Sequence, residues 1–215
     1  MNAFTPETPL AQAIGPIRTD LRLIADMVPE GARVLDIGCG DGALLDHLAR
    51  HKDVDGRGME LAQDGVSAAI GKGLSVIQGD ADTDLDDYPD GAFDVCILSQ
   101  TIQAMRAPKH VLGNLVRIGR CAIVSLPNFG SLAMRLHLLV KGRMPVTPTL
   151  PQSWYDTQNI HFCTISDFVD LCREMEIRID RSIGLDSQGR VSRNDATGRW
   201  ANLFCDQAIF LLSKR

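Results

Sequence analysis

A glycine-rich loop with acidic residues around it carries the clearest chemistry in this sequence. Residues 34–45 read VLDIGCGDGALL, an apolar run with one acid that passes into glycines at every second position. The stretch GCGDGA fits the pattern G-x-G-x-x-G/A, in which a strand ends in a loop that contacts a nucleotide before a helix begins. Glu60 follows this loop by about 20 residues, the distance at which the pattern places an acid for the ribose.

Acids at the ends of three successive predicted strands oppose a phosphate-bearing nucleotide. Asp36 stands two residues before the first glycine, Glu60 ends the next strand-like run, and Asp80 lies in QGDAD after the third. Carboxylates repel a pyrophosphate, whereas they attract an ammonium group and accept hydrogen bonds from hydroxyls. S-adenosylmethionine has a positive amine, a ribose and an adenine but no phosphate, so these acids favour it.

We therefore predict a site for S-adenosylmethionine or S-adenosylhomocysteine at the carboxyl edge of the sheet, where open α/β sheets bind their ligands. The loop glycines let the backbone approach the methionine part, Glu60 accepts the ribose hydroxyls, and Asp80 with Ala81 meets the adenine. No metal site is predicted. The predicted cofactor-binding residues are Asp36, Gly38, Cys39, Gly40, Gly42, Glu60, Leu61, Asp80, Ala81, Ser99 and Gln100.

Two other interpretations of these residues stay open. The acids could cap helices or lie solvated in loops, as single acids in such positions often do. The loop could also bind NAD in an oxidoreductase, although the chain shows no second mononucleotide-binding half. Three acids at strand ends next to a glycine loop favour S-adenosylmethionine over these two interpretations.

Alternating strand-like and helix-like stretches predict an α/β fold with a mostly parallel sheet. Two later strands, Ile177–Ile183 and Gln207–Leu212, are close enough in the chain to form a hairpin, which adds one antiparallel strand. The strands predicted before them are Arg33–Ile37, Gly56–Met59, Leu74–Gln78, Val95–Leu98 and Cys121–Ser125. The predicted helices are Ile17–Met27, Ala43–Arg50, Gln63–Gly71, Lys109–Ile118 and Ser166–Met175.

The composition indicates a globular protein rather than one that binds nucleic acid or a membrane. The 215 residues are 45% hydrophobic and 23% charged, with a net charge of -5, which opposes binding to nucleic acid or to an anionic membrane. No apolar run reaches the roughly 18 residues of a membrane span, and the first residues lack the features of a secretion signal. The six cysteines form no Cys-x-x-Cys pair, which favours reduced thiols in the cytoplasm.

Several motifs resemble those of class I S-adenosylmethionine-dependent methyltransferases. VLDIGCGDG, GME, QGDAD and FDVCILS occur in the order of that superfamily's motif series. Longer segments, among them SLPNFGSLAMRLHLLVKGRMPVT and LPQSWYDTQNIHFCTISDF, are similar to methionine-biosynthesis proteins of the MetW family. This second resemblance extends over nearly all of residues 18–185.

The resemblance implies a single Rossmann-like methyltransferase fold with helices on both faces of its sheet. The implied sheet is seven-stranded and mostly parallel, in the order 3-2-1-4-5-7-6, with strand 7 antiparallel and an insertion after strand 5. It further implies a cytoplasmic protein that binds S-adenosylmethionine or S-adenosylhomocysteine. The implied partner is a homoserine O-acyltransferase, using acetyl or succinyl groups, which this protein supports or regulates; neither nucleic acid nor a membrane is an expected partner.

The segment after the fourth strand bears on whether the chain transfers a methyl group itself. Many relatives carry a Glu-His pair near its end, where this sequence has Gln103 and Ala104. Two neutral side chains cannot remove a proton, which favours an accessory role. A substrate that is already nucleophilic needs no base, so an active small-molecule methyltransferase stays the alternative. His161 and Tyr155, in the segment expected to fold over the cofactor, are the candidate catalytic residues.

Residues 17–215 are predicted to form one methyltransferase-like domain, behind a flexible tail at residues 1–16 that contains several prolines. At about 128–160, an insertion serves as a lid or a partner surface. Its stretch GSLAMRLHLLVKGRMP combines a helical stripe of leucines with Arg135, Lys141 and Arg143. This stripe either docks a partner enzyme or is buried within the same chain.

An acidic run follows the third predicted strand and contains Asp82, Asp84, Asp86, Asp87 and Asp90. A calcium-binding loop requires a glycine at its middle and a glutamate at its end, and neither is in place. We therefore expect a solvated loop rather than a calcium site.

Overall fold

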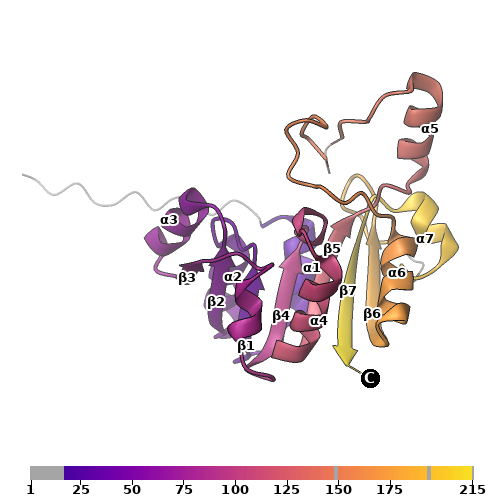
Figure 1. Ribbon diagram of the computed structural model, residues 1–215. Helices are drawn as coiled ribbons and strands as arrows, with labels where there is room; N and C mark the ends of the chain where they lie inside the picture. The colour runs from indigo at the N-terminus through magenta and orange to yellow at the C-terminus, as the bar shows by residue number, and fades with distance from the viewer. Residues whose placement is uncertain (1–16, 148–149, 193–194, 215) are drawn as a thin grey trace, which may run out of the picture.

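The computed structural model describes residues 17–147, 150–192 and 195–214, so the predicted tail at residues 1–16 lies outside the described residues. Over those residues, seven strands form one sheet in the order β3-β2-β1-β4-β5-β7-β6 (Figure 1). Strands β1 to β5 run parallel, and β7 runs antiparallel between β5 and β6. The predicted order and the predicted antiparallel strand are confirmed. The strands are β1 Arg33–Ile37, β2 Asp55–Glu60, β3 Ser75–Gln78, β4 Phe93–Ser99, β5 Gly119–Pro127, β6 Ile177–Leu185 and β7 Gln207–Lys214.

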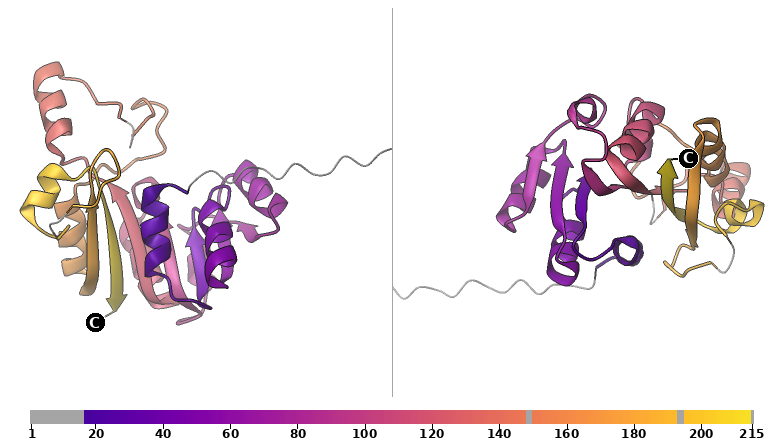
Figure 2. Two further views of the ribbon diagram at one scale, coloured as in Figure 1. Left: turned by 180° about the vertical axis from the view of Figure 1, so that it is seen from behind. Right: turned by 90° about the horizontal axis from the view of Figure 1, so that it is seen from below.

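Helices cover both faces of the sheet. The helices are α1 Thr19–Met27, α2 Ala43–Lys52, α3 Gln63–Gly71, α4 Pro108–Ile118, α5 Leu132–Lys141, α6 Ile165–Glu174 and α7 Arg199–Phe204, with short 3₁₀ turns η1 Asp84–Asp87 and η2 Ile102–Ala104. Helices α1, α2 and α3 pack on one face of the sheet through a buried cluster that includes Leu45. Helices α4 and α6 pack on the other face through a cluster that includes Leu115 and Phe168. Figure 2 shows α1 and α2 on the opposite side of the sheet from α4 and α6. None of the helices in the described residues has the length and apolar character that a membrane crossing requires.

Strand β1 explains why the fold requires an apolar run before the glycine loop. Its side chains alternate between the two buried clusters, with Leu35 and Ile37 in one and Val34 in the other. A parallel strand covered on both faces has no solvent-facing side, so apolar residues are favoured throughout. Asp36 departs from this rule, because it is only 2% exposed although its side chain is acidic.

The order in which the chain adds strands to the sheet switches at β1. From β1 the chain leads outward through α2 to β2, and from β4 it leads the other way through α4 to β5. Because the two crossovers lie on opposite faces, the carboxyl ends of β1 and β4 border a crevice, which is where open α/β sheets bind ligands.

Helix α5 follows β5 and projects from the carboxyl edge of the sheet (Figure 1). Met134 is the one buried side chain among its ten described residues. Leu136 and Leu139 of the predicted leucine stripe are exposed. Burial of this stripe within the same chain, one of the two alternatives from the sequence, is therefore wrong for the described residues.

The stretch between β6 and β7 contains a helix that the sequence pattern did not predict. Helix α7 spans only six residues, and Ala201 is its one buried side chain. Because six residues complete fewer than two helical turns, no apolar stripe can repeat within them and no periodic signal arises.

Candidate functional site

A cavity of about 850 Å³ opens beyond the carboxyl ends of the strands on the β1, β2 and β3 side of the crevice. Six predicted cofactor-binding residues line it: Gly38, Gly40, Glu60, Leu61, Asp80 and Ala81. The other lining residues are Ile37, Met59, Ala62, Gly79, Asp82, Thr101, Ala104, Met105, Arg106 and Gln158. Ile37, Met59, Leu61 and Met105 are among the apolar side chains of this lining, whereas Glu60, Asp80, Asp82 and Arg106 are its charged ones. The cavity therefore has the character of a small-molecule site.

The backbone of the glycine loop forms one wall of the cavity. Gly38 has φ +68° and Gly40 has φ +56°, in the left-handed region that favours glycine. A Cβ atom on Gly38 would lie 2.7 Å from Thr101 Oγ1, so even an alanine is too large there. The N–H of Gly38 donates to Met59 O at 2.8 Å, which joins the loop to β2. Glycine is therefore required both for the turn and for the close packing against Thr101.

Glu60 ends β2 and is held by two backbone donors. Its Oε2 accepts from the N–H of Gly40 at 2.8 Å, and its Oε1 accepts from the N–H of Ala62 at 2.9 Å. Each carboxylate oxygen can accept more than one hydrogen bond. Glu60 therefore presents a fixed pair of acceptors to the cavity that it lines.

Asp36 lies in β1, one residue before Ile37, and does not itself line the cavity. Within the described residues no hydrogen bond or ion pair satisfies its buried carboxyl group. Burial, and then the negative charge of Glu60, raise the pKa of Asp36 to about 7. A buried carboxyl group without a partner costs stability, which calls for an explanation such as a ligand. A positive charge in the neighbouring cavity would favour its ionised form, directly or through a water molecule.

The guanidinium group of Arg106 lies across the carboxylates of Asp80 and Asp82 at the rim of the cavity. Asp82 also accepts from the backbone N–H groups of Arg106 and Ala107, both at 2.9 Å, just before α4 begins. Although burial alone raises it, these hydrogen bonds hold the pKa of Asp82 below its ordinary value. The acids of this rim are therefore already paired within the protein.

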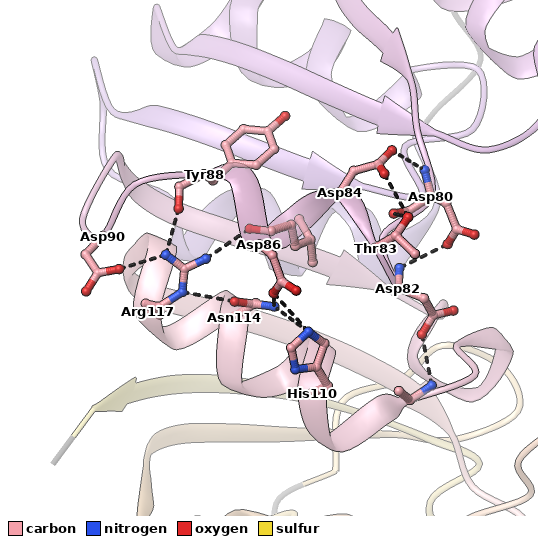
Figure 3. Close-up of polar contacts among 12 residues, drawn as sticks. Asp80, Asp82, Thr83, Asp84, Asp86, Tyr88, Asp90, His110, Asn114 and Arg117 are labelled. Atoms are coloured by element: carbon pink, nitrogen blue, oxygen red, sulfur yellow. Dashed lines mark hydrogen bonds and ion pairs between the residues drawn. The ribbon is translucent and has the colours of Figure 1, made fainter.

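The rest of the acidic run is likewise attached to its neighbours (Figure 3). Asp84 accepts from the backbone N–H of Asp80 at 2.8 Å, and Asp86 accepts from Asn114 of α4 at 2.8 Å. Arg117 of α4 donates to Asp90 at 2.7 Å. Asp86, Asp87 and Asp90 are nevertheless exposed, as expected for a solvated loop, and the bonds of Asp86 and Asp90 to α4 fix the position of this run. Among the described residues, no group of three or more His, Cys, Asp or Glu could hold a metal ion.

Four further predicted cofactor residues lie outside the cavity lining: Cys39, Gly42, Ser99 and Gln100. The side-chain amide of Gln100 donates to Asp20 of α1 at 2.9 Å, and Ser99 Oγ lies 3.2 Å from Ser125 Oγ. Burial, followed by the charges of Asp36 and Glu60, raises the pKa of the Cys39 thiol to about 12. Thr101, which the sequence did not single out, lines the cavity in place of its neighbour Gln100.

The two candidate catalytic residues also lie outside the cavity lining. Tyr155 is 70% exposed, and its ring lies nearly perpendicular to that of Trp154, with the ring centroids 5.6 Å apart. His161 is exposed, and its backbone N–H donates to Gln103 O at 2.9 Å. From the same segment, Gln158 does reach the cavity.

Gln103 is a structural residue of this edge of the sheet. Its side chain is buried, and its Nε2 donates to Pro127 O at 3.0 Å and to Cys163 O at 3.4 Å. The main-chain carbonyl oxygen of Gln103 accepts from the N–H groups of Ile160 and His161, both at 2.9 Å. Gln103 thus fastens the end of the insertion to η2 and β5.

Comparisons with solved structures show the same fold in S-adenosylmethionine-dependent methyltransferases. One from Thermotoga maritima, described as a possible histamine N-methyltransferase, has a TM-score of 0.68 and 18% identity, covering 92% of this chain and 88% of that one. One from Archaeoglobus fulgidus has a TM-score of 0.64 and 16% identity, covering 91% of both chains. The [4+2]-cyclase SpnF also shares the fold, with a TM-score of 0.64 and 19% identity over 90% of this chain and 80% of that one.

The sequence comparisons are more specific than the fold. A bifunctional methionine biosynthesis protein, MetXA/MetW, of Rhodopirellula baltica is 34% identical over 203 residues, covering 90% of this chain and 32% of the relative. This chain therefore spans about a third of the length of that relative. The family model of methionine biosynthesis protein MetW matches residues 18–212. With nearly all of its sheet and helices inside that match, the chain belongs to the MetW family of methionine biosynthesis proteins.

Proposed function

We propose that this protein binds S-adenosylmethionine or S-adenosylhomocysteine in the carboxyl-edge cavity and supports or regulates a homoserine O-acyltransferase in the cytoplasm. One observation carries the accessory role. The ionisable side chains that line the cavity are Glu60, Asp80, Asp82 and Arg106, and each already has a partner within the protein. The ionisable groups among the described residues that line the cavity are therefore held in hydrogen bonds and ion pairs, which suits the binding of a ligand better than proton transfer.

The residues of the cavity fit this cofactor. Asp36 would attract the positively charged amine, and the oxygens of Glu60 would accept from the ribose hydroxyls. Met59, Leu61 and Ala81 line the same cavity and offer an apolar surface to the adenine. A pyrophosphate would instead face the negative charges of Glu60 and Asp80, which opposes NAD. When bound, S-adenosylmethionine would supply an activated methyl group.

The proposed partner rests on the family and on the fused relative. The resemblance to MetW implies a homoserine O-acyltransferase as the partner. The relative from Rhodopirellula baltica is named as a bifunctional protein, MetXA/MetW, which joins two units in one chain. Fusion holds two units at high effective concentration, which supports the proposal that separate MetW and acyltransferase chains also associate.

Two measurements test the proposal with the purified chain. Titration calorimetry should show binding of S-adenosylmethionine or S-adenosylhomocysteine and no binding of NAD. Adding the chain to the homoserine O-acyltransferase of the same organism should raise or change its activity. Binding of NAD alone, or an acyltransferase unaffected by the chain with and without cofactor, would overturn the proposal.

A turnover assay separates this function from that of an active methyltransferase. The chain is incubated with S-adenosylmethionine and homoserine or O-acylhomoserine, and formation of S-adenosylhomocysteine is measured. We expect none above the rate without protein, because the ionisable side chains among the described residues that line the cavity are all paired. Steady formation with either acceptor would favour a small-molecule methyltransferase instead.

A further inference from the structure

The exposed apolar side chains of α5 form an unpartnered helix face. Leu139 and Val140 follow Leu136 by three and four positions, so the three side chains share one side of the helix. Leu139 is 81% exposed and Val140 is 79% exposed. Figures 1 and 2 both show α5 projecting away from the helices that cover the sheet. A soluble chain rarely leaves such a face open unless another molecule covers it.

The segment after α5 continues the same exposed apolar character. Trp154 and Tyr155 are each 70% exposed and contact one another edge to face. Trp and Tyr are enriched at the centres of protein interfaces, because their large rings bury much area at little entropy cost. The side of α5 that carries Leu136, Leu139 and Val140 is called the α5 face below, and the aromatic pair follows it in the same insertion.

The charge of the α5 face differs from that of the whole chain. Residues 95–155 contain no Asp or Glu, although the chain has a net charge of -5. Earlier in this stretch, Arg117 pairs with Asp90. Arg135 donates to Gly130 O at 2.6 Å, but neither it nor Lys141 or Arg143 forms an ion pair with any described residue. Cations that have no carboxylate partner next to an apolar helix face fit a partner that supplies the carboxylates.

We propose that the α5 face is the docking surface for the homoserine O-acyltransferase, which presents an apolar groove bordered by carboxylates. This inference rests on the proposed function and adds the location of the contact. A helix that lays its apolar face in a groove is a recurring mode of protein recognition. A second copy of this chain is a poorer occupant, because a two-fold contact between α5 faces would bring their cations together.

Binding measurements with single substitutions test this location. Leu139→Asp places a charge at the centre of the α5 face, whereas Ile70→Asp makes the same change at an exposed site, 55% accessible, on α3. We expect Leu139→Asp to weaken the affinity for the acyltransferase about tenfold or more, as loss of a central interface residue does. Ile70→Asp should bind like the wild type. Circular dichroism and S-adenosylmethionine titration of both variants should match the wild type.

Three results would overturn the proposed function, the docking surface or both. If the wild-type chain does not bind the acyltransferase, the proposed function fails and the docking surface fails with it. If the wild type binds and Leu139→Asp binds equally well, the docking surface is wrong while the proposed function stands. If light scattering shows a wild-type dimer that Leu139→Asp separates, with acyltransferase binding intact, the α5 face is a self-contact and this inference is overturned.

Discussion

The carboxylate of Glu60 accepts a hydrogen bond from the N–H of Gly40 at 2.8 Å, which joins the end of β2 to the loop after β1. A second backbone donor, Ala62, holds the other oxygen at 2.9 Å. Because main-chain groups hold it, this carboxylate has its orientation before any ligand arrives, and the binding of hydroxyl groups requires little further ordering. Glu60 is therefore both part of the loop structure and a proposed contact for the ribose.

Glu60→Ala should weaken binding of S-adenosylmethionine by about 1–3 kcal/mol, because hydrogen bonds to a charged acceptor are lost. Titration calorimetry measures this change. Glu30→Ala is the matched control, since Glu30 is exposed in the turn before β1 and does not line the cavity. Equal affinity of Glu60→Ala and Glu30→Ala would show that the ribose does not contact Glu60.

Gly38→Ala should destabilise the protein by roughly 1–3 kcal/mol and abolish cofactor binding, since an L-residue is strained at φ +68° and its Cβ would clash with Thr101. Urea unfolding and cofactor titration measure the two effects. Gly71→Ala at the end of α3 is the control, because a Cβ there meets nothing within 4 Å. If Gly38→Ala were as stable as Gly71→Ala, the described loop conformation would be wrong.

The strands and helices that carry the site could be predicted from sequence because their patterns are local. β1 spans the predicted Arg33–Ile37 and α3 the predicted Gln63–Gly71 without any change of boundary. The apolar run of β1 and the spacing of buried residues in α3 follow directly from burial. The proximity of the acids at the strand ends could also be predicted, because the carboxyl ends of parallel strands meet at one edge of the sheet.

Side-chain directions at the edge of the sheet could not be predicted, because they depend on distant parts of the chain. Gln100 turns to Asp20, which is 80 positions away in sequence, and its φ of +56° is unusual for a residue other than glycine. The exposure of Leu139 likewise depends on the direction in which α5 leaves the sheet. The periodicity of apolar residues in the sequence does not predict that direction. Pairing of the acidic run with α4 required knowing that Asn114 and Arg117 face it.

Asp36 should make both stability and cofactor binding depend on pH. Its pKa in the folded protein is about 7, above the ordinary value of an unfolded aspartate, so folding favours the protonated form. Its contribution to the free energy of unfolding is therefore most favourable below the unfolded pKa. This contribution declines as pH rises and is fully lost above about 7.

Asp36→Asn should remove this decline, so that the ligand-free variant loses less stability between pH 5 and 8 than the wild type does. The wild type should bind S-adenosylmethionine more tightly as pH rises through about 7 and release a proton on binding below that pH, because the amine favours the carboxylate. Calorimetry in buffers of different ionisation enthalpy measures the proton. A wild type and an Asp36→Asn variant with the same pH profiles would contradict this role of Asp36.

The cofactor cavity and the α5 face should be thermodynamically coupled, because the insertion that carries α5 also lines the cavity through Gln158. Gln158 lines the cavity, Ile160 and His161 donate to Gln103 O, and the same insertion carries α5. An acyltransferase that orders this segment changes the cavity wall, and binding linkage is reciprocal. We expect the dissociation constant of S-adenosylmethionine to change by about fivefold or more when the acyltransferase is bound.

Titrating S-adenosylmethionine into the chain alone and into the preformed complex measures the coupling, with Ile70→Asp as a variant that should retain it. In the reverse direction, saturating S-adenosylmethionine should change acyltransferase activity in the mixed complex, so that occupancy of the cavity reports the level of the cofactor. If the two dissociation constants are equal and the activity does not respond, the segment transmits nothing. The chain would then act on the acyltransferase through contact alone, because a ligand that binds both states equally cannot shift their equilibrium.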